Sequence, residues 1–390
     1  MKILYGFTNC TDTLYYRIYK NSDRAISRPD QKYHGLLIRG LSEFVDSIYC
    51  ISGLPVNRKS INKLWVHEND ETENNVYYHY IATINFPILR RIMVFCGTLL
   101  SVLKTHKNRD TFAICDCLNV ANAYGMALGA HLRRIPIVMI VTDLPDMIKA
   151  SKRDRNINNF LFRMADGFVF LTEQMNERIN KKKKPYIVME GHVDAKAIIP
   201  NVAEKYEITN GKKVIIYAGS LRKLYGIQNL VEGFQLANMQ DAELWIYGDG
   251  DYRDELKNKI LKDKRIKYMG VRNNSEVIQA ETRAALLVNP RPSAPEYTKY
   301  SFPSKNMEYM VSGTPVLTTN LPGMPEEYKR YVYIIEKETS DGIAQAIKRI
   351  FDERMEDRNE KALLARRFVL EKKNNVVQAE KIISLLRSYI

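Results

Sequence analysis

Several features are missing from this 390-residue sequence, and each absence disfavours a class of protein. The five cysteines are odd in number and lack paired CxxC spacing, which favours reduced thiols in a cytoplasmic protein over disulfides or a zinc site. The first residues, MKILYGFTNC, contain no long apolar run, so we expect no signal peptide. A GxGxxG fingerprint is also missing, because Arg253 stands where the third glycine after Gly248 and Gly250 belongs. Nicotinamide or flavin chemistry is therefore disfavoured.

No apolar run is long enough to cross a bilayer, which takes roughly 20 consecutive apolar residues. The most apolar stretch, residues 84–102, is interrupted by Pro87, Arg90 and Arg91. We predict a core helix here, with contact to lipid headgroups as the alternative.

Acidic residues are fewer than basic ones, and the net charge of +14 points to an acidic partner such as a nucleotide, a nucleic acid or a lipid surface. Cations are dense between residues 152 and 184: Lys152, Arg153, Arg155, Arg163, Arg178 and the run Lys181 to Lys184. No RNA-binding motif or helix-turn-helix pattern accompanies them, so nucleic acid is disfavoured. An anionic membrane surface and an ordinary solvated face both remain open.

The second half of the sequence alternates apolar strands with helical patterns. The predicted strands are 213–219, 242–248, 265–270, 284–290, 314–319 and 331–336, and the predicted helices are 226–238, 250–261, 274–281, 304–312 and 340–353. Strands that are apolar on both faces indicate a parallel sheet covered by helices on both sides. Ligands of such doubly wound sheets bind at the carboxyl ends of the strands.

The first half repeats this alternation less regularly. Its predicted strands are 1–6, 46–52, 110–116, 135–141, 167–172 and 185–190, with helices near 31–45, 87–104, 119–132 and 154–164 and a loop at 67–75. Residues 195–212 are a plausible linker, and 361–388 read as one long amphipathic helix. We therefore predict an α/β protein of two doubly wound Rossmann-like domains facing each other across a cleft.

Two segments of the second half carry residues suited to a phosphate. After the strand KVIIYAG, Gly219 and Ser220 form a tight corner, and Arg222 and Lys223 follow at the carboxyl end of the strand. An exposed basic loop is the alternative interpretation. The Asp249-Gly250-Asp251 turn is read as ordinary turn chemistry, and no metal is expected.

The second segment is SFPSKNMEYMVSGTPVL, residues 301–317. Pro303 fixes the entry to a helix, Ser304 is the predicted cap, and Lys305 lies in the positive first turn, which suits an anion. Met307, Met310 and Val311 form the predicted buried stripe, and Ser304, Glu308 and Ser312 form a second, polar stripe.

The ordered set AGSLRKLYGIQNLVEGF, IYGDGDYRDEL, KYMGVRNNSEVI, NPRP and SFPSKNMEYMVSGTPVL resembles the nucleotide-sugar domain of retaining GT-B glycosyltransferases. The chain is similar to glycosyltransferase family four, especially its bacterial capsule and exopolysaccharide members. The resemblance implies an acceptor-binding domain at 1–195, completed by about 372–390, and a nucleotide-sugar domain at 196–371. It also implies that the C-terminal helix crosses back to the N-terminal domain.

The resemblance assigns roles to single residues. Glu308 matches the glutamate that binds the donor ribose, and Ser304 and Lys305 match the helix start beside the diphosphate. The implied donor site is completed by Gly219, Ser220, Arg222, Lys223, Gly248 and Arg291. Asp143, Arg222 and Lys305 are the predicted catalytic residues.

This sequence departs from the family pattern at three places. Tyr300 stands where the family often has a first glutamate, and Glu296 is out of register. The family's Arg and Lys after the first strand fall on Ser220 and Tyr225, so Arg222 and Lys223 are the substitutes. The frequent His-Asp becomes Thr142-Asp143, which leaves Asp143 either orienting a substrate or serving as a turn residue.

The resulting prediction is a retaining hexosyltransferase that moves a sugar from a nucleoside diphosphate to a hydroxyl of a lipid-diphosphate-linked glycan in cell-surface polysaccharide synthesis. No cofactor or metal is expected. We expect a cytoplasmic protein bound peripherally to the inner, anionic face of the membrane, and no nucleic-acid partner. The alternatives are a non-hydrolysing nucleotide-sugar epimerase, and a basic membrane or nucleic-acid binding protein with a decayed sugar site.

Overall fold

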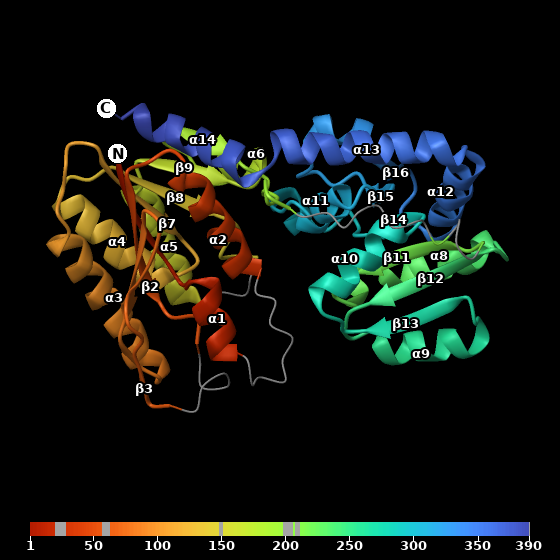
Figure 1. Cartoon of the computed structure of the whole chain (residues 1–390), viewed down its shortest axis with the longest axis horizontal. Helices are drawn as coiled ribbons and strands as arrows, with labels where there is room; N and C mark the ends of the chain where they lie inside the picture. The colour runs from red at the N-terminus through yellow and green to blue at the C-terminus, as the bar shows by residue number, and fades with distance from the viewer. Residues whose placement is uncertain (20–28, 57–62, 148–150, 198–205, 207–210, 390) are drawn as a thin grey trace. The chain divides into compact units, whose positions relative to one another are not determined.

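The computed structural model describes residues 1–19, 29–56, 63–147, 151–197, 206 and 211–389. The chain forms two compact units, one of Met1–His192 with Asn375–Ile390 and one of Val193–Asn374 (Figure 1). The boundaries thus fall after His192 and Asn374, where the sequence placed them after 195 and 371. Most of the predicted linker at 195–212 lies outside the described residues. None of the described helices is both long and apolar enough to span a bilayer.

The first unit is built on an eight-stranded sheet in the order β10-β9-β8-β7-β1-β2-β5-β4. Its strands are β1 (Lys2–Phe7), β2 (Ser47–Gly53), β4 (Glu71–Glu73), β5 (Val76–Ile81), β7 (Thr111–Asp116), β8 (Ile137–Val141), β9 (Gly167–Phe170) and β10 (Tyr186–Val188). All neighbouring strands are parallel except the edge pair β4 and β5. Every residue of β7, β8 and β9 is buried, which explains their continuous apolar sequence.

Helices cover this sheet (Figure 1). They are α1 (Asp12–Tyr19), α2 (Pro29–Ser42), α3 (Pro87–Lys104), α4 (Val120–Leu132), α5 (Lys152–Met164), α6 (Glu173–Ile179) and α14 (Asn375–Arg387), and a small pair, β3 (Trp65–Val66) with β6 (Thr83–Ile84), precedes α3. Ser151 and Thr172 begin α5 and α6 by accepting hydrogen bonds from the N–H groups of Asp154 and Met175. Local capping chemistry thus fixes where these two helices start.

The second unit has a six-stranded, fully parallel sheet in the order β13-β12-β11-β14-β15-β16. Its strands are β11 (Lys213–Ala218), β12 (Ala242–Tyr247), β13 (Ile266–Gly270), β14 (Leu286–Asn289), β15 (Val316–Thr319) and β16 (Tyr333–Ile335). Its helices are α8 (Ile227–Ala237), α9 (Arg253–Lys262), α10 (Asn274–Arg283), α11 (Ser304–Val311), α12 (Ser340–Asp352) and α13 (Met355–Lys372), with short 3₁₀ turns η1 (Lys223–Tyr225), η2 (Glu296–Tyr300) and η3 (Glu326–Tyr331). The predicted fold class, two Rossmann-like α/β domains, is confirmed.

The expected loop at 67–75 and the expected single terminal helix are both wrong. Residues 67–75 are not only loop, because β4 pairs with β5 around a turn at Asn74, whose φ is +54°. The long terminal helix is broken into α13 and α14, since Lys373 leaves the helical conformation and its carbonyl accepts the Val193 N–H at 3.0 Å.

The apolar stretch 84–102, predicted as a core helix, instead contributes to the surface helix α3. Only Val94, Thr98 and Val102 of α3 are buried, and they form its inner stripe. That stripe packs closely on α4 because Gly125 and Gly129 have no side chain: a Cβ there would lie 2.7 Å from the Phe95 carbonyl oxygen and 2.8 Å from Val102. Met93, Phe95, Gly97 and Leu99 are partly buried, and the remaining apolar residues of α3 are exposed.

The last helix, α14, completes the core of the first unit. Its apolar residues Ala379, Ile382, Ile383 and Leu386 are buried in the same cluster as Ile3, Leu37 and Ile48. Asn375 donates from Nδ2 to the Leu36 carbonyl at 3.0 Å, which fixes the start of α14 against α2.

Ile382→Ala is expected to destabilise the first unit by about 2–5 kcal/mol, because it removes buried methyl groups and leaves a cavity. Leu363→Ala is the matched control, since Leu363 on α13 is exposed. Urea unfolding of both variants checks this, and equal stability of the two would mean that α14 does not support the core.

Candidate functional site

Most of the predicted donor-site residues lie at the carboxyl edge of the second sheet. β11 lies between β12 and β14 in the sheet. After β11 the chain adds β12 and β13 on one side of β11, and then adds β14, β15 and β16 on its other side. A ligand of an open α/β sheet binds at such a switch point. The loops after β11, β12 and β14 and the start of α11 meet this edge.

The loops after β11 and β12 are held together through two predicted glycines. The N–H of Gly219 donates to the Tyr247 carbonyl at 3.1 Å, and the N–H of Leu221 donates to the Asp249 carbonyl at 2.9 Å. Gly248 has φ +123°, and a Cβ there would lie 1.8 Å from the Gly219 carbonyl oxygen. Only glycine permits this close approach.

The two aspartates of the Asp249-Gly250-Asp251 turn are engaged in local structure. Asp249 accepts from the Gly250 N–H at 2.9 Å, and Asp251 accepts from the Lys223 N–H at 2.9 Å. Among the described residues no group of three His, Cys, Asp or Glu side chains could hold a metal ion. This turn therefore shapes the neighbouring loop after β11.

Two buried side chains fasten α11 to this edge. The hydroxyl of Tyr309 accepts from the Ala218 N–H at 2.9 Å and donates to the Ala218 carbonyl at 3.2 Å, at the end of β11. Asn306 accepts from Asn289 Nδ2 at 2.7 Å and donates to Thr318 Oγ1 at 3.2 Å, which connects α11 to the ends of β14 and β15. No role was predicted for either residue, although both lie within the SFPSKNMEYMVSGTPVL segment.

Because Asn306 and Tyr309 face the sheet, Lys305 and Glu308 lie on another side of α11. Lys305 Nζ and Glu308 Oε2 are 2.8 Å apart, and both side chains are about one-third exposed. Burial would lower the pKa of Lys305, but the carboxylates of Glu308 and Glu281 outweigh it and raise that pKa. The lysine is therefore charged at neutral pH, beside a carboxylate that can accept hydrogen bonds.

The start of α11 differs from the prediction in its cap. Ser304 is the first helical residue and is exposed; Pro303 precedes the helix, and no side chain of the described residues caps it. The polar stripe is also shorter than predicted, since Ser312 is buried and donates to the Tyr309 carbonyl at 2.6 Å. Val311 is only partly buried. The uncapped N-terminus leaves first-turn N–H groups suited to an anion.

Arg222 and Lys223 occupy the loop after β11 but have different surroundings. Lys223 Nζ lies 2.6 Å from Glu255 Oε2, and that carboxylate raises the pKa of the lysine. Arg222 is exposed and makes no ion pair with any residue that the structure describes. Arg222 is therefore the cation of this loop that is available to an anionic ligand.

Arg291 follows β14 on the opposite side of the switch point. Its guanidinium lies between the rings of Tyr225 and Tyr297, with centroids 5.2 Å and 4.9 Å away, and its buried Nε has no hydrogen-bond partner within the described part of the chain. Gly226 packs directly on the Pro290 carbonyl, which brings the loops after β11 and β14 into contact. Ser220 contributes its carbonyl, which accepts from the Tyr217 hydroxyl at 2.7 Å.

Asp143 belongs to the first unit, where it is exposed just after the end of β8. Its charge contributes to raising the pKa of the buried Cys117 thiol, after the larger effects of burial, Asp116 and Cys115. Asp143 therefore lies at the carboxyl edge of the first sheet, near the end of β7.

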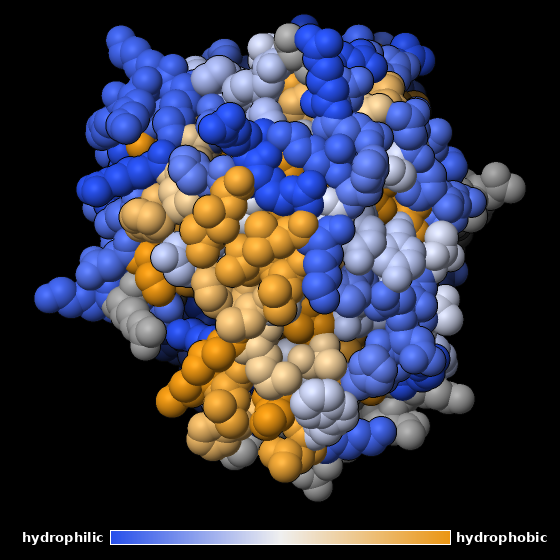
Figure 2. Space-filling model, turned by 90° about the vertical axis from the view of Figure 1, so that its left-hand side faces the viewer, coloured by the Kyte–Doolittle hydropathy of each residue, from blue (hydrophilic) through white to orange (hydrophobic). Residues whose placement is uncertain are grey.

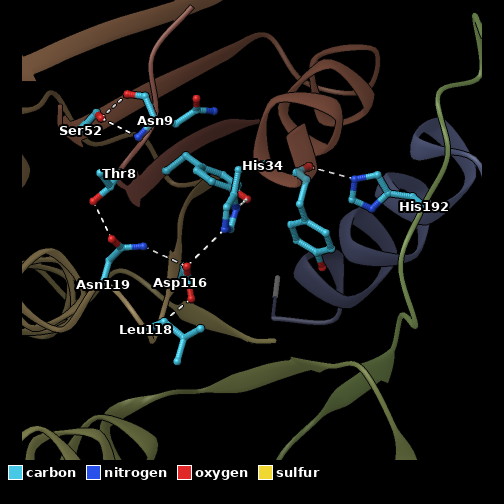
Figure 3. Close-up of polar contacts among 10 residues, drawn as sticks. Thr8, Asn9, His34, Ser52, Asp116, Leu118, Asn119 and His192 are labelled. Atoms are coloured by element: carbon cyan, nitrogen blue, oxygen red, sulfur yellow. Dashed lines mark hydrogen bonds and ion pairs between the residues drawn. The ribbon is translucent and has the colours of Figure 1, made fainter. Parts of the chain in front are cut away.

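That edge holds a buried polar network that the sequence analysis missed (Figure 3). Asp116, at the end of β7, accepts from the Leu118 N–H and from Asn119 Nδ2, both at 2.9 Å, and faces His34 Nε2 at 3.3 Å. Thr8, just after β1, donates to Asn119 Oδ1 at 2.5 Å. β1 lies between β7 and β2, so this network occupies the switch point of the first sheet.

The histidines of this region are fixed by their partners. The Nδ1 of His34 lies 2.8 Å from the Tyr5 hydroxyl and its Nε2 lies 3.3 Å from Asp116 Oδ2, so both ring nitrogens have a buried partner. His192 donates from Nε2 to the Tyr33 carbonyl at 2.9 Å, and burial lowers the pKa of His192 to about 4. Both therefore act as structural hydrogen-bonding groups. The six histidines are scattered in sequence, and nothing in their spacing indicates these contacts.

Comparison with known proteins agrees with this geometry. Residues 199–387 match the family described as Glycosyl transferases group 1. N-acetyl-alpha-D-glucosaminyl L-malate synthase of Bacillus anthracis is 25% identical over 329 residues, which cover 79% of this chain and 80% of that protein. Alr3699/HepE of Anabaena in complex with UDP has a TM-score of 0.68 at 16% identity, with 100% of both chains covered.

Sucrose-phosphate synthase from Thermosynechococcus elongatus has a TM-score of 0.72 at 12% identity, with 100% of this chain and 99% of that one covered. At these identities the two solved structures are evidence for the fold alone. Together with the family match, they identify a glycosyltransferase of the GT-B fold. Residues 199–387 are the part that matches the group 1 family, and the predicted resemblance to GT-B glycosyltransferases is confirmed, whereas the capsule and exopolysaccharide type stays a prediction.

Tyr309→Phe is expected to lower the free energy of unfolding by about 1–3 kcal/mol, because it leaves the N–H and carbonyl of Ala218 without their partner. Tyr16→Phe, at an exposed tyrosine of α1, is the control. Chemical denaturation monitored by circular dichroism measures both. An unchanged Tyr309→Phe midpoint would show that α11 is held by apolar packing alone.

Proposed function

We propose that the chain transfers a sugar from a nucleoside diphosphate donor to a hydroxyl of a glycan, with retention of the anomeric configuration. The proposed acceptor is linked to a lipid diphosphate, and the reaction serves the synthesis of a bacterial capsule or exopolysaccharide. One observation carries the donor assignment: Lys305 and Glu308 project from a helix that is anchored at the switch point of the group 1 domain.

The donor is proposed to lie along the carboxyl edge of the second sheet. Glu308 would accept hydrogen bonds from the ribose hydroxyls, which suits an acceptor-only carboxylate. Lys305, Arg222, Arg291 and the start of α11 would contact the diphosphate, and Gly219 and Gly248 would allow its close approach. Two structures of the Anabaena neighbour contain UDP and UDP-glucose, which supports a nucleotide-sugar ligand.

In the proposed reaction the acceptor oxygen bonds to the anomeric carbon while the bond from that carbon to the diphosphate oxygen breaks. The diphosphate leaves with the bonding electrons, and one of its oxygens accepts the hydroxyl proton. The negative charge that grows on the diphosphate is stabilised by Arg222, Lys305 and the helix dipole. Asp143 is proposed to orient the sugar or the acceptor, and no metal is required.

The positive charge of the chain supports the proposed lipid-linked acceptor and the proposed location at the membrane. The net charge of +14 and the cations between residues 152 and 184 favour attachment to an anionic membrane surface from the cytoplasmic side. Six of these cations, Arg155, Arg163, Arg178, Lys181, Lys182 and Lys184, line a hollow of about 430 Å³ in the first unit.

The two neighbouring cations of the loop after β11 provide a paired test. Arg222→Ala is expected to lower kcat on the order of 100-fold, because it removes charge stabilisation of the leaving group. Lys223→Ala is expected to have a much smaller effect, since Lys223 is already paired with Glu255. Steady-state kinetics with UDP-, GDP- and TDP-sugars measure kcat of both variants. A larger loss of kcat for Lys223→Ala than for Arg222→Ala would contradict the assignment of Arg222 to the leaving group.

Glu308→Ala is expected to weaken donor binding roughly 10-fold or more, because hydrogen bonds to a charged group contribute about 1.5–3 kcal/mol. Binding is measured by the rise in melting temperature with UDP or a UDP-sugar, which increases as RT ln(1 + [L]/Kd). Glu360→Ala, which removes an exposed carboxylate on α13 of the same unit, is the control. Equal nucleotide affinity in all three proteins would place the ribose elsewhere.

A further inference from the structure

The outer side of α3 is an exposed apolar surface on the first unit. Figure 2 shows a continuous apolar area on the face where α3 and α4 lie. The α3 apolar face consists of Ile88, Leu89, Ile92, Cys96, Leu100 and Leu103, all exposed. Four of them, Ile88, Ile92, Cys96 and Leu100, are spaced four residues apart and so form one stripe along the helix.

Neighbouring side chains extend this surface at both ends and across α4. Trp65 and Phe86 are exposed where the chain enters α3, and Leu132 is exposed at the end of α4. Phe95 of α3 stacks on Tyr124 of α4 at 5.2 Å, and Tyr124 meets the exposed Phe160 of α5 edge-on at 5.9 Å. An apolar area of this extent on a unit that already has its own core indicates an interaction surface.

The charges around the α3 apolar face have a single sign along α3 and α4. Residues 87–109 contain Arg90, Arg91, Lys104, Lys107 and Arg109 but no Asp or Glu, and residues 117–142 contain Arg133 and Arg134 but no Asp or Glu. Arg91 contacts Asp154 at 3.2 Å, which connects α3 to α5, and the cation-lined hollow lies on another side of α5.

We propose that the α3 apolar face is the surface by which this protein docks on an anionic lipid bilayer. A helix lying in the interface buries its apolar side chains at the boundary of headgroups and acyl chains while flanking Lys and Arg side chains contact anionic headgroups. The apolar stripe occurs here together with the exposed cations Lys104, Arg109 and Arg134, whereas Arg90 and Arg133 donate to backbone carbonyls of the protein. A second copy of the chain fits poorly, since a two-fold contact through this face would bring its own cations together.

This inference deepens the membrane attachment proposed above, and it makes the apolar side chains the main anchor. The contribution of cations alone falls with ionic strength, because salt screens charge. Burial of Ile92 and Leu100 is not screened. The docked protein therefore retains part of its bilayer affinity at high salt.

The test compares full-length variants in flotation with vesicles of phosphatidylcholine, with and without phosphatidylglycerol. Ile92→Ser with Leu100→Ser is expected to weaken binding to the anionic vesicles at least tenfold and to abolish the salt-resistant part. The control is Leu236→Ser with Leu261→Ser on α8 and α9, because these side chains are comparably exposed: 51% and 71%, against 53% for Ile92 and 52% for Leu100. The control is expected to bind as the unchanged protein does.

Trp65 gives a second readout that does not depend on any α3 variant. Its fluorescence is expected to shift to shorter wavelength on addition of phosphatidylglycerol vesicles, and Trp65→Phe removes that shift and leaves only Trp245. UDP-induced stabilisation is measured on the same samples. It is expected to be unchanged in the serine variants, so a failed donor assignment and a failed docking surface are distinguished.

Three results would overturn the proposal. The first is flotation that the α3 substitutions leave unchanged while Lys181–Lys184→Gln abolishes it, which would assign attachment to the basic cluster alone. The second is absence of both flotation and the Trp65 shift. The third is a concentration-dependent dimer, detected by light scattering and lost in Ile92→Ser with Leu100→Ser, without vesicle binding.

Discussion

The hydroxyl of Tyr309 determines how the candidate site is arranged. It serves both backbone groups of Ala218, at the point where β11 ends. Asn306, one turn earlier, fastens the same helix to the ends of β14 and β15. Since successive helical residues are about 100° apart, fixing residues 306 and 309 toward the sheet directs Lys305 and Glu308 elsewhere. The position of the charged pair thus follows from two uncharged, buried side chains.

The first unit also fixes its chain at the carboxyl ends of its strands through buried polar side chains, but with different residues. At its switch point, where connections leave the sheet in opposite directions, the polar groups at the strand ends are satisfied by Asp116, Asn119 and His34. A buried carboxylate is tolerated here because it accepts several hydrogen bonds. In the second unit two glycines, Gly219 and Gly248, bring the loop backbones together without such a network.

The sequence predicted the parallel sheets well because the middle residues of strands buried on both faces form apolar runs, as in β7, β8 and β11. Polar edge strands such as β4 have no such pattern. His34 and Asp116 are 82 residues apart in the sequence, and only the order of strands in the sheet makes them neighbours. The ion pair of Lys223 with Glu255 on α9 could likewise not be predicted from the sequence. The exposed side of α3 was predicted to be buried because apolar content alone does not tell whether a side chain faces the core or the solvent.

The return of the chain in α14 has a consequence for synthesis. Ile382, Ile383 and Leu386 complete a core whose other members come from the first part of the chain, including Ile3 and Leu37. A ribosome delivers them only after all of Val193–Asn374 has been made. Domains fold as units during translation, so the second unit is able to fold while the first still exposes apolar surface. The core of the first unit can therefore be completed only after the whole second unit has been synthesised.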